Sequence, residues 1–202
     1  MNKATILLAV PLLALLQACN MGGGGNASSG DSVQGELAGA RIGAPFTLTN
    51  QDGKPTHWDD YKGQYRLVYF GYTHCPDACP LALQTMSEAL DRLGRIGETI
   101  TPVFVTIDPA RDTPAVLKRY VEMFHPRMKA VSGDDAAIAE IAERYKIIYK
   151  RVDLGPDRPY TMDHTTSIYL TDKTGRVIGR FLHTLTAGEL GAKIAARLAR
   201  EP

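Results

Sequence analysis

Residues 66–80 constrain the chain most, because an apolar run leads directly into two closely spaced cysteines. Leu67–Tyr72 is apolar and aromatic, a composition that predicts a buried β-strand. Cys75 and Cys79 follow, and a helical pattern of apolar residues begins after them. A helix N-terminus has unpaired N–H groups and positive partial charge, which favour the thiolate form of a cysteine. The segment therefore predicts a chemically active cysteine pair at a strand–helix junction.

Both cysteines precede a proline, Pro76 or Pro80. A residue before proline is disfavoured in the α conformation, so we expect residues 75–79 to form a stiff loop. Pro80 then fits the first position of the helix, where no N–H is needed. The spacing also allows a reversible disulfide between the two thiols. The alternative is a pair of buried structural cysteines or an inert disulfide.

Residues 1–18 have the pattern of a signal peptide. Lys3 is followed by the apolar stretch Ala4–Leu16, which is short for a membrane span. Residues 16–19, Leu-Gln-Ala-Cys, resemble the bacterial lipobox, in which the cysteine is lipidated and becomes the new N-terminus. The alternative is an ordinary signal peptide that is cut near Ala18. In either case we expect an exported protein in a compartment where disulfides form.

Residues 20–36 are rich in glycine, serine and asparagine, which predicts a flexible tether. Such a tether has a reach of roughly 20–25 Å. We therefore divide the chain into a signal peptide (1–18), a lipidated tether (19–36) and one domain (37–202). The chain has 23 basic and 22 acidic residues, and removal of Lys3 balances them. A net charge near zero argues against a nucleic-acid binder, and it leaves membrane anchoring to the lipid.

Strand and helix patterns alternate through the domain. Thr113 is the expected N-cap of the second helix, with Pro114 in its first position. The order predicts a three-layer α/β domain with a central mixed sheet. The expected strands are 45–49, 66–72, 100–107, 128–131, 147–152, 165–170 and 176–181, and the expected helices are 81–96, 114–124, 135–145 and 186–200.

Four stretches resemble the Sco/SenC family of copper-binding, thioredoxin-like assembly proteins. Residues 69–80, Tyr-Phe-Gly-Tyr-Thr-His-Cys-Pro-Asp-Ala-Cys-Pro, are similar to the family signature. Residues 105–114 resemble its second motif, and Tyr145 begins a run similar to its third. Residues 163–170 resemble the segment that supplies a histidine ligand. The resemblance extends over about residues 40–199 in the same order.

The resemblance implies a thioredoxin-like fold in which Cys75, Cys79 and His164 hold copper. Thiolates suit Cu(I), and imidazole suits both Cu(I) and Cu(II), so this donor set fits either oxidation state. In thioredoxin folds the loop before the penultimate strand faces the cysteines, and we expect residues 162–165 to be that loop. Asp77 and Asp163 are candidates to orient a ligand by hydrogen bonding, with ordinary turn chemistry as the equal alternative.

The resemblance implies a copper metallochaperone that delivers copper to, or matures, the dinuclear copper centre of a cytochrome c oxidase. Its expected partner is the copper-centre subunit of that membrane oxidase. Lipid on Cys19 would hold it at the periplasmic face of a bacterial membrane. The alternative function is a thiol–disulfide oxidoreductase that keeps target cysteines reduced and is itself recharged by a thiol reductant protein. Both functions use Cys75 and Cys79, but only the first needs His164 as a ligand.

Overall fold

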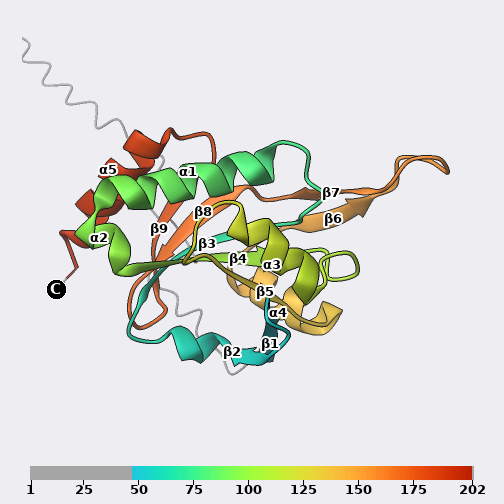
Figure 1. Ribbon diagram of the computed structural model, residues 1–202, viewed down its shortest axis with the longest axis horizontal. Coiled ribbons are helices and arrows are strands. Elements are labelled where there is room, and N and C mark those ends of the chain that lie inside the picture. Colours follow the sequence, from blue (N-terminus) through green and yellow to red (C-terminus); the bar gives the residue numbers. More distant parts are fainter. Residues whose placement is uncertain (1–46, 202) are drawn as a thin grey trace, which may run out of the picture.

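A seven-stranded mixed β-sheet forms the centre of the computed structural model, which describes residues 47–201 (Figure 1). The predicted signal peptide and the tether with Cys19 lie outside these residues. The strand order is β2-β1-β5-β4-β3-β8-β9. The bounds are β1 Thr47–Asn50, β2 Pro55–His57, β3 Tyr65–Gly71, β4 Ile100–Thr106, β5 Lys129–Ser132, β8 Ser167–Thr171 and β9 Val177–Leu182.

The helices lie on both faces of this sheet. β3, β4 and β5 are parallel neighbours, so right-handed connections place the first and third helices on one face. The ring of Tyr120 in the third helix packs 5.5 Å from that of Phe104 in β4. On the other face, Tyr145 packs 5.0 Å from Phe70 of β3. The helices are α1 Ala78–Leu93, α2 Arg95–Glu98, α3 Pro114–Glu122, α4 Asp135–Arg144 and α5 Ala187–Leu198, with a 3-10 turn at Trp58–Tyr61.

This arrangement confirms the predicted α/β fold with three layers and a mixed sheet. α5 lies beside α1, with α3 on the same face of the sheet, and Tyr145 follows α4 directly (Figure 1). β8 runs antiparallel to β3, and β9 runs antiparallel to β8. The predicted cap of α3 is also confirmed, because the Thr113 hydroxyl accepts the N–H of Val116 and Pro114 opens the helix. Among the described helices, none is both long and apolar enough to cross a membrane.

β3 is the buried strand that the sequence predicts. Leu67, Val68, Tyr69 and Phe70 are all fully buried, since the strand is paired on both edges and covered on both faces. It ends at Gly71, so the loop with the cysteines begins at the carboxyl edge of the sheet. A strand held on four sides is a rigid base for that loop.

The expected start of the first helix was wrong. α1 begins at Ala78, and Asp77 is its N-cap, so Cys79 lies within the first helical turn. The loop is therefore shorter than the predicted residues 75–79, and Pro80 is the third helical residue. The N–H groups of a first turn have no intrahelical partner, so a proline there removes no helical hydrogen bond. The backbone before Pro80 accepts the helical conformation despite its usual preference.

The expected loop at residues 162–165 was also wrong, because most of it is a strand. β7 (Thr161–His164) pairs antiparallel with β6 (Tyr149–Val152), and His164 lies opposite Tyr149. These two strands form a separate ribbon that extends beyond the main sheet (Figure 1). Thr-Met-Asp-His has no apolar alternation, which explains why the pattern did not indicate a strand.

Candidate metal centre

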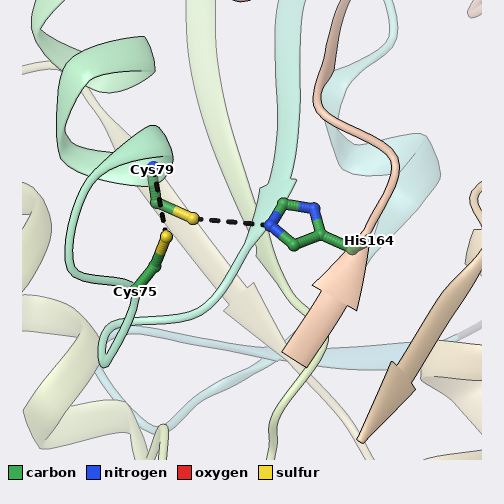
Figure 2. Close-up of side chains that lie close together, drawn as sticks. All are labelled: Cys75, Cys79 and His164. Atoms are coloured by element: carbon green, nitrogen blue, oxygen red, sulfur yellow. Dashed lines mark hydrogen bonds between the residues drawn. The ribbon is translucent and has the colours of Figure 1, made fainter. Parts of the chain in front are cut away.

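Cys75, Cys79 and His164 come together as the group of metal-ligating side chains in the described part of the chain (Figure 2). One donor atom from each lies within 4.8 Å of the others. The Cys79 sulfur is 3.7 Å from Nε2 of His164. Cys75 and His164 are partly exposed and Cys79 is fully buried, so the centre is open on one side.

Three different elements supply the three side chains. Cys75 lies in the loop after β3, Cys79 in the first turn of α1, and His164 at the end of β7. The backbone N–H of Cys79 donates to the Cys75 sulfur at 3.4 Å, which folds the loop back onto the helix. Gly71 leaves the space for this packing, because a Cβ there would lie 2.7 Å from the Cys79 sulfur.

The imidazole of His164 has one nitrogen occupied and one directed at the sulfurs. Its Nδ1 lies 2.9 Å from the carbonyl oxygen of Thr165, which can only accept, so Nδ1 carries the proton. Nε2 then presents its lone pair to the cysteine pair, as a metal-binding histidine requires. The rings of Tyr69 and Tyr72 lie edge-on to the imidazole at 6.2 and 6.0 Å. These contacts hold the ring in one orientation.

The two thiols have opposite pKa shifts. The hydrogen bond from the Cys79 thiol lowers the pKa of Cys75 to about 3, and the bonds from the N–H groups of Asp77 and Cys79 act in the same direction against partial burial. The pKa of Cys79 is raised, because its proton is held by the Cys75 thiolate and because the sulfur is buried. The pair therefore shares one proton, with the negative charge on Cys75.

This arrangement supports two kinds of chemistry. Two sulfurs and one imidazole nitrogen form a soft donor set that fits copper in either oxidation state. A thiolate at a helix N-terminus is also a nucleophile toward disulfides, and Cys79 lies within reach to complete the exchange. The sulfur chemistry does not need the histidine, whereas a three-donor copper site does.

Two further predicted residues, Asp77 and Asp163, and the neighbouring His74 lie around the centre without joining the donor group. Asp77 is exposed, and its side chain makes no cap hydrogen bond to α1. Asp163 is exposed and lies opposite Lys150, and it points to the other face of the ribbon from its neighbour His164. His74 is exposed, with Nδ1 at 3.2 Å from the Thr73 hydroxyl. A role of either aspartate in orienting a ligand stays a prediction.

Sequence reasoning missed the two tyrosines that flank His164. Tyr69 and Tyr72 belong to the apolar, aromatic run that predicted β3, and a run of this kind is explained by core packing alone. The signal that distinguishes them is spatial, since β7 must first be placed beside the end of β3. No spacing in the sequence indicates that placement.

The charge distribution of the pair predicts selective alkylation. In the reduced, metal-free protein, Cys75 should stay a thiolate above its pKa of about 3, so its reaction with iodoacetamide should change little between pH 8 and pH 5. An ordinary thiol with a pKa of about 8.5 loses reactivity about tenfold per pH unit over the same range. Peptide mass spectrometry at each pH measures the two rates. Equal rates for Cys75 and Cys79, both falling tenfold per unit below pH 8, would contradict the assignment.

Comparison with known proteins places this centre in a family. The family model described as SCO1/SenC matches residues 34–199. The SCO2-like protein of Rickettsia prowazekii is 38% identical over 151 residues, which cover 74% of this chain and 74% of that protein. The chain spans 53% of the human mitochondrial SCO1 homologue, with 35% identity over 159 residues.

A solved structure agrees in fold and carries the expected metal. ScoI of Bradyrhizobium japonicum, solved with copper bound, is 42% identical with a TM-score of 0.69, and the match covers 77% of this chain and 99% of that one. The match therefore includes nearly all of a domain that holds copper. Taken together, the matched residues and the relatives show that the chain belongs to the SCO1/SenC family.

Proposed function

We propose that this protein is a copper metallochaperone that delivers copper to, or matures, the dinuclear copper centre of a cytochrome c oxidase. The observation that carries the proposal is the convergence of the Cys75, Cys79 and His164 donor atoms within 4.8 Å. A disulfide-exchange protein has no need of a histidine whose free nitrogen is directed at its sulfurs. Membership of the Sco family and the copper bound by the Bradyrhizobium relative support the same reading.

Each residue has a definite task in binding this copper cargo. Cys75 is already a thiolate and meets the incoming ion as the first ligand. Cys79 must lose its proton to become the second ligand, so binding releases a proton at that sulfur. His164 adds the neutral Nε2 donor without a change of charge. The open side of the centre leaves the bound ion accessible to a recipient.

Removal of the histidine distinguishes a metallochaperone from a reductase. His164→Ala should weaken copper binding by roughly tenfold to a hundredfold or more, above all for Cu(II), since the loss of a ligand should cost at least as much as the loss of a ligand's hydrogen-bond partner. The disulfide chemistry of Cys75 and Cys79 should remain. Competition with a chelator of known affinity measures binding of each copper ion to the reduced protein.

The control is His183→Ala, which removes a partly buried histidine outside the donor group and should bind copper like the unchanged protein. In cells, oxidase activity should fall in the His164→Ala strain and recover with added copper. Protein oxidised to the Cys75–Cys79 disulfide should not bind, because both thiolate ligands are gone. A His164→Ala protein with unchanged copper affinity and normal oxidase assembly at low copper would refute the chaperone function.

The second candidate, a thiol–disulfide oxidoreductase, is favoured by the low pKa of Cys75 alone. In that reaction the Cys75 thiolate attacks a target disulfide and releases one target thiolate, which takes the proton of Cys79. The Cys79 thiolate then attacks the Cys75 sulfur, releases the second target thiolate and leaves a Cys75–Cys79 disulfide. A thiol reductant protein must supply two electrons to restore the pair. In cells, this function predicts nearly normal oxidase activity in the His164→Ala strain and no oxidase activity in the Cys75→Ser strain.

The same proposal includes a lipid anchor at the periplasmic face of a bacterial membrane. Its support is the lipobox-like Leu16–Cys19 sequence and the glycine-rich residues behind it. Cys19→Ser should abolish labelling with a fatty-acid analogue and release the protein from the membrane fraction. The control is Cys75→Ser, which should keep both labelling and membrane partitioning. A Cys19→Ser protein that is still labelled would refute the anchor.

A further inference from the structure

The turn between β4 and α3 contacts both segments that carry the metal ligands. Its two aspartates are almost completely buried, with 4% exposure for Asp108 and 0% for Asp112. Burial of a carboxylate costs free energy unless hydrogen bonds compensate for the lost water. The hydrogen-bond partners of these two residues are therefore held in place. A helix cap needs neither residue, because Thr113 caps α3 by itself. The two buried aspartates therefore have a role other than capping α3.

Asp112 holds the base of the cysteine loop. It accepts the backbone N–H of Thr73 at 3.1 Å and the Thr73 hydroxyl at 2.6 Å. It also accepts the hydroxyl of Thr106, at the end of β4, at 2.6 Å. Thr73 is two residues before Cys75, so Asp112 fixes the start of the loop to the neighbouring strand. Burial raises the pKa of Asp112, and these hydrogen bonds oppose that shift.

Asp108 and Arg111 hold the ribbon that carries His164. The hydroxyl of Tyr160 donates to Asp108 at 2.8 Å. Arg111 pairs with Asp108 and also donates to the backbone carbonyl of Tyr160 at 2.9 Å. Tyr160 is the residue directly before β7, so both bonds are made at the beginning of the strand that ends in His164.

Two guanidinium groups enclose the Tyr160 ring. The central carbon of Arg111 is 3.6 Å from the ring centroid, and that of Arg151 in β6 is 3.8 Å away. Two groups this close cannot share one face, so the ring lies between them. The stack joins the turn, β7 and β6 by cation–π contacts. Beside it, the hydroxyls of Tyr72 and Thr161 are 2.7 Å apart, which ties β7 to the end of β3.

Side-chain contacts of this kind are needed because the ribbon has no backbone ladder to the main sheet. β6 and β7 pair only with each other among the described strands. In the rest of the domain, ladder hydrogen bonds set the position of each strand. Here the place of β7 depends on side-chain contacts: those at its first residues, the packing of Met162 and Tyr149 against the core, and the tyrosine rings beside His164. A small rotation of the ribbon would move His164 away from the sulfurs.

We propose that Asp108, Arg111 and Tyr160 are positioning residues that aim His164 at the cysteine pair, while Asp112 holds the cysteine loop opposite it. The turn thereby sets the 3.7 Å approach of Nε2 to the Cys79 sulfur from both sides. The copper-binding measurements that test this inference rest on the proposed function. The positioning of His164 by the turn does not depend on it.

The test is a double-mutant cycle between Tyr160 and His164. Tyr160→Leu should weaken copper binding about tenfold or more, within the range seen when a ligand loses its supporting contacts. It should also shift the Cu(II) absorption and electron paramagnetic resonance spectra toward those of His164→Ala. Tyr160→Leu combined with His164→Ala should bind no more weakly than His164→Ala alone, because the first change acts through the second residue. Tyr160→Phe keeps the ring between the arginines and should have a smaller effect.

Tyr65→Leu is the matched control. Tyr65 also makes a cation–π contact, since Nζ of Lys173 lies 5.3 Å from its ring centroid. It is the first residue of β3, at the end away from the cysteine loop, so its loss should leave copper affinity and spectra unchanged. The reduction potential of the Cys75–Cys79 pair should be equal in the parent protein and in Tyr160→Leu. Wild-type copper affinity in folded Tyr160→Leu, or additive losses in the double variant, would overturn the inference. If Tyr160→Leu does not fold, unchanged copper affinity and spectra in Tyr160→Phe would overturn it.

A metal-free measurement separates this inference from the copper function. In the reduced apoprotein, Tyr160→Leu should shift or broaden the imidazole resonances of His164 in nuclear magnetic resonance spectra, and the Thr73 amide should stay in place. Unchanged His164 resonances would refute the positioning role whether or not the protein binds copper. Failure of the unchanged protein to bind copper, with shifted resonances in Tyr160→Leu, would refute only the metallochaperone function.

Discussion

The approach of His164 to the Cys79 sulfur is the contact on which the centre depends. The two atoms are 3.7 Å apart and belong to residues 85 positions apart in the chain. One sulfur is carried by the loop after the buried strand β3 and the other by the first turn of α1, and both cysteines pack against the core. The imidazole is carried by a ribbon outside the main sheet. Burial fixes the two cysteines, and a few specific side-chain contacts fix the ribbon that carries His164.

The shared proton of the cysteine pair connects this geometry to its chemistry. The charge is placed on the more exposed sulfur, Cys75, and the proton on the buried one, Cys79. A thiolate on the more exposed sulfur is available to a soft cation such as copper, and the buried thiol must lose its proton to become a second ligand. The same distribution also keeps the pair competent for disulfide exchange. The histidine is the feature that turns a redox pair into a candidate metal site.

Much of the fold and of the candidate site could be predicted from the sequence. The apolar run of β3, the capping pair Thr113 and Pro114, and the alternation of strands and helices indicated a mixed three-layer domain, because each depends on local patterns. The three candidate ligands followed from the family resemblance. The start of α1 at Ala78 was missed because proline is tolerated in a first helical turn. β7 was missed because its residues, Thr-Met-Asp-His, have no apolar alternation. Tyr160 was missed because its partners Asp108 and Arg111 lie 52 and 49 positions earlier in the chain.

X-ray absorption spectroscopy at the copper edge tests the central claim most directly. The reduced protein, loaded with one equivalent of Cu(I) or Cu(II), gives the identity and number of the atoms bound to the ion. The account predicts two sulfur neighbours and one imidazole nitrogen for each copper, with the imidazole signal lost in His164→Ala. A copper ion bound by sulfur alone in the unchanged protein, or by nitrogen and oxygen without sulfur, would contradict it.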